Sequence, residues 1–146
     1  YAMVHSLHTT VLMLADSYAE GDQRPRFLSA LRDAWSTGRR LEASGGEQII
    51  DLVHAEDLAE AFFSAAELPN SGSSFNEYCV PSGESCDLRA LVARIAAATG
   101  STFNIAWGAR PYAADEVFRP VFRAPPLPGW QPRISLDQGL ARFFSK

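Results

Sequence analysis

Short apolar runs alternate with amphipathic segments along this chain, and that alternation constrains the fold more than any other feature. The run Val11–Leu14 is bounded by two threonines and the turn-rich stretch DSYAEGD, which is typical of a fully buried strand. The segment 45–54 (GGEQIIDLVH) indicates a turn into a second strand, and 75–80 (FNEYCV) indicates a third. In 102–107 (TFNIAW), apolar and polar residues alternate as they do in a half-buried strand.

Helical spacing of apolar residues marks the segments between these runs. Asp87 is a favourable N-cap, and Ser135 with Gln138 three residues later forms a capping box. Strands that alternate with helices predict an α/β fold, in a single layered domain over residues 1–146 without internal repeat or linker. The helices are expected from Pro25 to Gly38, around Leu58 to Ala65, from Asp87 to Gly100, and from Ser135 through Phe143.

The composition excludes several classes of function. A net charge of −4 argues against a nucleic-acid-binding surface, because phosphate recognition relies on clustered cations. The short basic stretches RPRF and GRR are interpreted as solvated arginines at helix ends. No apolar run approaches the roughly 20 residues that span a bilayer, and no signal-peptide pattern is found. We therefore expect a cytoplasmic protein that binds neither nucleic acid nor membrane.

Candidates for metal or thiol chemistry are few. Cys79 and Cys86 lack metal-ligand spacing and are expected to be packing residues. Asp51, His54 and Asp57 stand close together in the sequence, but an acidic residue in the first turn of a helix suits the helix dipole. We expect structural roles for these three residues and predict no metal site.

Four blocks of the sequence, in this order, resemble the C-terminal, substrate-binding half of extended short-chain dehydrogenases/reductases. They are VLMLADSYAEGDQRP, GGEQIIDLVHAEDLAEAF, FNEYCVPSGESCDLRALV, and PYAADEVFRPVF followed by PGWQPRISLDQGL. The family comprises NAD(P)-dependent nucleotide-sugar epimerases, dehydratases and ketoreductases. The resemblance covers nearly the whole chain and implies a small layered α/β domain like that half of those enzymes.

The features that the resemblance assigns to the cofactor and to proton transfer are missing. In the family, a glycine-rich turn of an N-terminal half holds the cofactor, and a Tyr-x-x-x-Lys pair transfers the proton. No G-x-G-x-x-G occurs here, so no glycine turn brings a helix N-terminus to a dinucleotide pyrophosphate. His5 stands where the lysine would follow Tyr1, and Lys146 is the only lysine of the chain. We therefore expect no cofactor.

The resemblance also indicates changes at the substrate site. Met13, Ile50 and Ala113 stand where relatives carry arginines, and the resemblance implies that the last two arginines hold the substrate's pyrophosphate. Loss of two charge-assisted partners, each contributing about 1.5–3 kcal/mol, weakens such binding by roughly two to four powers of ten. Arg110 and Arg119 are the candidates for substitutes.

The predicted substrate-binding residues follow from these changes. Met13 and Ile50 are expected to form apolar walls of a cleft, and Arg110 and Trp107 are expected beside them. For Trp107, a place in the core is the alternative.

Asp16, Tyr18 and Tyr112 are the predicted catalytic residues. Asp16 stands where relatives have an asparagine, and desolvation beside apolar walls would raise its pKa and let it act as an acid. Tyr18 and Tyr112 can each present an apolar ring and one hydroxyl group to a bound molecule.

Three functional hypotheses follow. The first is a stand-alone, cofactor-free protein that binds a largely apolar secondary metabolite, of the polyene or polyketide type, and acts as a cyclase or isomerase through preorganisation. The second is a substrate-binding fragment of an NAD(P)-dependent nucleotide-sugar epimerase or dehydratase, and the third is a non-catalytic pseudoenzyme that acts as a binding module. A chain without the cofactor half would expose apolar surface, so we also expect a homodimer.

Overall fold

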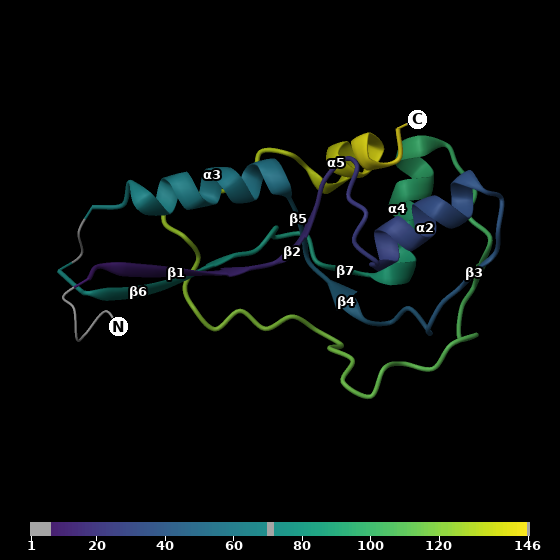
Figure 1. Cartoon of the computed structure of the whole chain (residues 1–146), viewed down its shortest axis with the longest axis horizontal. Coiled ribbons are helices and arrows are strands. Elements are labelled where there is room, and N and C mark those ends of the chain that lie inside the picture. The colour runs from purple at the N-terminus through teal and green to yellow at the C-terminus, as the bar shows by residue number, and fades with distance from the viewer. Residues whose placement is uncertain (1–6, 70–71, 146) are drawn as a thin grey trace.

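The computed structural model describes residues 7–69 and 72–145, and it has the expected α/β fold (Figure 1). Tyr1 and His5 lie outside the described residues. The strands are β1 (Thr9–Leu14), β2 (Asp16–Tyr18), β3 (Leu41–Glu42), β4 (Ile49–Ile50), β5 (Leu52–His54), β6 (Phe75–Val80), β7 (Cys86–Asp87) and β8 (Ile105–Ala106). The helices are α2 (Phe27–Ser36), α3 (Ala55–Ala66), α4 (Leu88–Thr99) and α5 (Leu136–Phe143).

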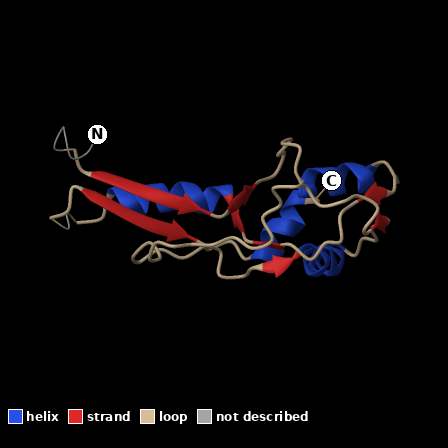
Figure 2. Cartoon of the chain, turned by 90° about the horizontal axis from the view of Figure 1, so that it is seen from below, coloured by secondary structure: helices blue, strands red, loops and turns tan. Residues whose placement is uncertain are grey.

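β1 and β6 form a parallel two-stranded ribbon at one end of the molecule, with α3 alongside it (Figures 1 and 2). Thr9 lies opposite Phe75, and Leu14 lies opposite Val80. The prediction of a fully buried strand is wrong here, because Val11 is 37% and Leu14 is 41% exposed. Within the described residues β1 pairs with β6 alone, so its other edge has no strand partner there and stays open. The partial exposure of this pair is unusual, because parallel sheets are normally covered on both faces.

Three helices, α2, α4 and α5, gather at the other end, which we call the helical end (Figure 1). Leu31 of α2, Leu91 and Ile95 of α4, and Leu140 of α5 are each at most 1% exposed and belong to one hydrophobic cluster. Because each such side chain contributes about 1.5–3 kcal/mol when it is fully buried, this cluster supplies most of the core.

The expected caps begin and end two of these helices. The Asp87 carboxylate accepts the Ala90 N–H at 2.7 Å, and α4 ends at Gly100, whose φ of 65° is the left-handed conformation. The Ser135 hydroxyl accepts the Gln138 N–H at 3.3 Å, and the Gln138 side chain accepts the Ser135 N–H at 3.2 Å. Both predicted N-caps are confirmed.

Two predicted boundaries differ from the structure. α2 begins at Phe27 instead of Pro25, because Arg26 keeps an extended backbone with φ of −119°. The strand expected over 102–107 is limited to Ile105–Ala106, because its partner β3 is only two residues long.

A short parallel pair, β2 with β5, joins the ribbon to the helical end. β2 follows directly on β1, and His54 at the end of β5 leads straight into α3. On the ribbon side, the segment 125–127 runs along β6, where the Cys79 N–H donates to the Pro125 carbonyl at 2.8 Å. A second, smaller hydrophobic cluster fills this region and consists of Ala15, Val53, Leu58, Ala61, Val80 and Leu127.

Two buried carboxylates tie segments together, in agreement with the structural roles expected for them. Asp51 accepts the Ser82 N–H at 2.7 Å and the Ser85 hydroxyl at 2.8 Å. Asp57, on α3, accepts the N–H groups of residues 133 and 134 at 3.1 and 3.0 Å. In the described part of the chain, no helix is both long and apolar enough to span a membrane.

Candidate functional site

Two adjoining cavities in the helical end form the candidate site. The larger measures about 920 Å³ and lies between α2, the β3 region, the start of α4 and the segment 110–116. The smaller measures about 240 Å³ and lies between β2, the start of α2, β4, β5 and α5. Arg26, Phe27 and Ser29 belong to the walls of both cavities, so the start of α2 is where they meet.

Local hydrogen bonds fix the start of α2. The Ser29 hydroxyl oxygen accepts the Arg26 N–H at 3.1 Å and donates to the carbonyls of Arg24 and Arg26. The Arg26 guanidinium reaches back to β2 and pairs with the Asp16 carboxylate at 2.6 Å. Arg26 is the N-cap of α2, and the Ser29 hydroxyl holds its backbone N–H.

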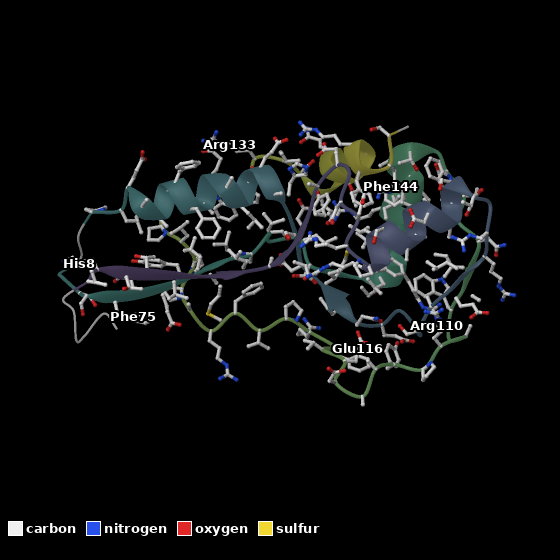
Figure 3. All side chains as sticks on the ribbon, viewed as in Figure 1. His8, Phe75, Arg110, Glu116, Arg133 and Phe144 are labelled. Atoms are coloured by element: carbon white, nitrogen blue, oxygen red, sulfur yellow. The ribbon has the colours of Figure 1, made fainter. Side chains whose placement is uncertain are left out.

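The segment 108–118 closes the opposite wall of the larger cavity. The Arg110 N–H donates to the Ala43 carbonyl at 3.1 Å, and the Ile49 N–H donates to the Phe118 carbonyl at 2.8 Å. The Gln48 side chain donates to Glu116 at 3.3 Å. Figure 3 shows Arg110 and Glu116 on this segment, below α2 and β3.

Tyr18 and Ile50, two of the predicted site residues, line the smaller cavity. Tyr18 is 2% exposed, and its ring makes an edge contact with His54 at a centroid distance of 5.3 Å. Its hydroxyl packs against Gly139 of α5, where an added Cβ would overlap the tyrosine ring. Burial, followed by the charges of Asp57 and Glu20, raises the pKa of Tyr18 above its usual value of 10. Tyr18 is therefore a protonated wall residue.

Asp16 also lines the smaller cavity, but not in the environment that its predicted acid role needs. Its side chain is 47% exposed and pairs with Arg26. The desolvation that the sequence-based prediction assumed is absent, because Asp16 starts β2 at the cavity mouth instead of its interior. An exposed, paired carboxylate is suited to orienting Arg26.

Three predicted site residues lie away from both cavity walls. Met13 lies within the ribbon, opposite Cys79, because β1 ends before the chain reaches the cavities. Trp107 stacks on Phe27 at a centroid distance of 6.1 Å and lies under the Arg89 guanidinium, so it supports the wall from behind.

Tyr112 is the third predicted site residue that lies away from both cavity walls. Its hydroxyl is hydrogen-bonded to the Glu47 carboxylate and accepts the Glu47 N–H, and its ring contacts Phe118. It fastens the segment 108–118 to the turn before β4. By contrast, Arg110 and Ala113 both line the larger cavity, as Ile50 lines the smaller one.

Glu20, His54 and Glu56 lie close enough together to hold a metal ion. The His54 Nδ1 accepts the Glu56 N–H at 3.3 Å, so in the neutral ring Nε2 carries the proton and donates to Glu20 at 3.0 Å. Arg142 lies 3.9 Å from Glu20 and 3.6 Å from Glu56. Because this guanidinium already supplies the positive charge, we interpret the group as an ion-pair network that caps α3.

Sequence reasoning missed Arg26, Phe27 and Ser29, the residues shared by the two cavities. The stretch RPRF was interpreted as solvated, although Arg26 faces the site. One signal was present: an arginine stands at an N-cap, where residues with an accepting side chain are normal. Gly139 was missed as well, because nothing in the sequence places it against Tyr18.

The comparisons with known proteins agree with this fold. The model of the NAD dependent epimerase/dehydratase family matches residues 1–80, which is more than half of the chain. The chain belongs to this family. Among curated family members, CDP-abequose synthase of Salmonella typhimurium is 22% identical over 151 residues, which cover 100% of this chain and 50% of that protein. The chain thus spans about half the length of the curated relatives it matches.

Solved structures of family members share the fold at low identity. UDP-glucose 4-epimerase of Thermotoga maritima, solved with UDP-glucose, has a TM-score of 0.80 and 20% identity, and covers 98% of this chain and 47% of its own. The dTDP-glucose 4,6-dehydratase of Bacillus anthracis, solved with NAD, has a TM-score of 0.79 and 17% identity, and covers 99% of this chain and 46% of its own.

The residues of this chain do not fit the dinucleotide that the family name implies. A dinucleotide pyrophosphate needs a glycine-rich turn between a strand and a helix. Here β5 passes from His54 directly to Ala55 of α3, and β7 passes from Asp87 directly to Leu88 of α4, without an intervening glycine. The described residues therefore contain no such turn.

Proposed function

We propose that this chain forms the substrate-binding part of an enzyme that modifies a sugar carried on a nucleoside diphosphate. Membership of the NAD dependent epimerase/dehydratase family supports this proposal. The names of the relatives support it further, since they refer to sugars linked to CDP, UDP or dTDP. In such an enzyme this chain binds and orients the sugar nucleotide, and the redox cofactor belongs to residues that it does not supply.

The observation that carries the proposal is the pair of adjoining cavities. Their volumes of about 920 and 240 Å³ are sufficient for a ligand of this size, because small-molecule sites usually measure about 300–1,000 Å³. The larger cavity has polar and charged walls that suit a nucleotide, including Ser44, Gln48 and Arg110. The smaller cavity has apolar walls such as Ile50 and Leu52, with polar groups at its mouth, where a sugar ring can stack and bond.

Titration calorimetry with UDP-glucose, CDP-glucose and dTDP-glucose tests the proposal. We expect at least one of them to bind with a Kd between about 1 μM and 1 mM, the usual range for enzyme substrates. Ala30 on α2 lines the larger cavity, so Ala30→Trp should obstruct part of it and weaken binding. Ala59→Trp, at an exposed position of α3, is the matched control and should bind normally. The proposal fails if none of the three ligands binds, or if both variants behave alike.

The alternative, a cofactor-free cyclase or isomerase for an apolar metabolite, is favoured by one observation, the apolar lining of the smaller cavity by Leu28, Ile50 and Phe143. Its volume of about 240 Å³ is below the usual size of ligand sites, and the Tyr112 hydroxyl is engaged with Glu47. Incubation of the protein with polyene and polyketide substrates without added cofactor separates the hypotheses, and we expect no turnover.

A further inference from the structure

α3 has two apolar faces, and the described residues cover one of them. Leu58 and Ala61 face the ribbon and belong to the hydrophobic cluster there. The outward face of the helix is apolar as well, although it contacts no other layer of the described structure. We call this face the outer stripe, and its residues are Ala55, Ala59, Phe62, Phe63 and Ala66.

The outer stripe has regular helical spacing and is exposed. Its members stand at i, i+4, i+7, i+8 and i+11, which places them on one side of a helix. All five are exposed, and the fractions reach 55% for Phe62 and 67% for Phe63. A helix with apolar residues on opposite faces is normally buried between two layers. The stripe therefore indicates a second layer beyond the described residues.

The stripe lies on the side of α3 that is turned away from β6. Asp57, Glu60 and Ser64 line a cavity together with the segment 129–133, which follows the residues that run along β6. Because each residue turns a helix by about 100°, Phe62 lies on the opposite flank, towards the open edge of β1. The open strand edge and the outer stripe are thus parts of one surface.

β1 presents a parallel edge without charge. It pairs with β6 in parallel, and β2 with β5 and β3 with β8 do the same. Strands of a parallel sheet are connected through helices that cover its faces. A further parallel strand on β1, with its helix beside α3, would bury Val11 and Leu14, which are 37% and 41% exposed.

The handedness of strand connections predicts where the helix of such a unit lies. The chain passes from β1 to β6 by way of α3, which lies on one face of the ribbon (Figure 2). Connections between parallel strands of one sheet are right-handed in nearly all proteins. A unit that adds a strand to the free edge and then enters β1 continues in the same direction across the sheet. Its helix therefore lies on the face of α3, next to the outer stripe.

Charges at the rim of the stripe narrow the choice of partner. Glu60 and Glu67 border the stripe on the flank away from β1, and neither has an ion pair within the described residues. A second copy of this chain, packed antiparallel on the same stripe across a two-fold axis, would bring these carboxylates against their own copies, which is destabilising. A different helix that carries arginine or lysine at this rim is complementary instead.

We propose that the open edge of β1 and the outer stripe together bind a strand–helix unit of the cofactor-side part of the enzyme. The strand lies parallel to β1, and the helix lies beside α3 with basic residues at its rim. The inference rests on the proposed function, which leaves the cofactor to residues outside this chain. The relatives have the necessary length, because this chain covers 50% of CDP-abequose synthase and a β-α-β unit needs about 30 residues.

The main test uses the half of Salmonella typhimurium CDP-abequose synthase that this chain does not match, produced as a separate polypeptide. Native mass spectrometry and calorimetry measure its binding to wild type, Phe62→Ser/Phe63→Ser and Leu14→Lys. Val117→Ser/Val121→Ser is the matched control, because these valines are 68% and 66% exposed but lie far along the chain from α3 and β1. Thermal unfolding of each variant checks that the exposed substitutions leave the fold intact.

We expect a one-to-one complex with wild type. Phe62→Ser/Phe63→Ser should weaken it by about tenfold to hundredfold, because two apolar rings lose their burial. Leu14→Lys should weaken it as well, because a charge on an edge strand opposes the addition of another strand. Val117→Ser/Val121→Ser should bind as wild type does.

A second probe carries the helix alone and does not depend on the folding of the synthase half. It is a fluorescein-labelled helical peptide with leucine and alanine on one face and arginine at the rim, compared with the same peptide carrying glutamate in place of arginine. We expect wild type to bind the arginine peptide at least about tenfold more tightly. Glu60→Gln/Glu67→Gln should lose most of this preference.

The inference is overturned if the synthase half binds wild type and Phe62→Ser/Phe63→Ser equally, or if neither probe binds wild type. A dimer of the chain alone that depends on Phe62 and Phe63 would assign the stripe to a second copy and overturn it too. Titration with UDP-glucose keeps the proposed function separate, because the outer stripe lines neither cavity and its variants should bind this ligand normally. The proposed function fails if wild type binds no sugar nucleotide, whatever the two probes do.

Discussion

The ribbon and the helical end of this molecule arise from the same alternation of strands and helices, but they bury their apolar side chains to different degrees. In the helical end, Leu91 and Leu140 are completely buried. In the ribbon, Val11, Leu14 and Phe75 are between 37% and 47% exposed. The larger cavity lies in the helical end, and the smaller one lies between α2, α5 and the β2–β5 pair that joins the helical end to the ribbon. A binding site must hold its side chains in fixed positions, and neither cavity is lined by a residue of the ribbon.

The largest expected effect comes from truncating one leucine in each region. Leu91→Ala leaves a cavity in the closed core of the helical end and should lower the free energy of unfolding by about 3–4 kcal/mol. Leu14→Ala, at a 41% exposed position of the ribbon, should cost below about 1 kcal/mol. Urea unfolding of both variants measures the difference. Equal losses would contradict the contrast between the two regions.

Gly139→Ala tests how tightly the helical end is packed. A methyl group at this position overlaps the Tyr18 side chain, and Gly139 has no positive φ that would explain the glycine otherwise. We expect a loss of about 2–3 kcal/mol, because the usual gain from alanine in a helix is outweighed by the overlap. In a thermodynamic cycle with Tyr18→Ala, the double variant should be more stable than the sum of the two single losses predicts.

Asp57→Ala breaks a contact that joins the two regions. Asp57 lies on α3 beside the ribbon, and its carboxylate accepts the N–H groups of Arg133 and Ile134, just before α5. Two buried N–H groups would lose their acceptor, so we expect a loss of about 2 kcal/mol. Glu60→Ala, on the exposed side of the same helix, is the control and should change stability by below about 0.5 kcal/mol. Hydrogen exchange should show faster opening of α5 in Asp57→Ala alone.

The smallest expected effect concerns a polar turn at the mouth of the smaller cavity. Hydrogen bonds from Arg24 hold the pKa of Asp22 at about 2, below its usual 3.8. A pKa that is lower in the folded state stabilises the fold above the usual pKa, and this contribution disappears as the pH falls from about 4 to 2. Arg24→Gln should therefore cost about 1 kcal/mol at neutral pH. The difference from wild type should shrink in urea unfolding at about pH 3. A constant difference across this range would contradict the assignment.

The sequence predicted the class of fold and several element ends because those depend on local signals. Asp87, Gly100 and Ser135 act on their own helices, and their roles can be read without knowledge of the rest of the chain. The exposure of β1 could not be predicted in this way. An apolar strand has the same sequence pattern whether its neighbour strands are present or absent.

The candidate site was predicted in part, for a related reason. Ile50, Tyr18 and Arg110 line the two cavities, and their predicted roles in binding and catalysis stay predictions. Arg26 is solvent-exposed at a helix start, as expected, but its place on both cavity walls was not predicted, because its direction depends on the pairing with Asp16, ten residues earlier. Met13 lies in the ribbon, away from both cavities, and Trp107 packs against the core, which was the alternative for this residue.

The open edge of β1 has a practical consequence for handling the protein. β1 reads Thr-Thr-Val-Leu-Met-Leu and contains neither a charged side chain nor a proline, the two devices that most often stop a strand from recruiting another. β1 itself carries no charge that would repel an identical strand, so concentrated samples should form sheet-like aggregates that grow from Thr9–Leu14. A single lysine introduced at Leu14 would act as a gatekeeper and improve the working solubility of the chain.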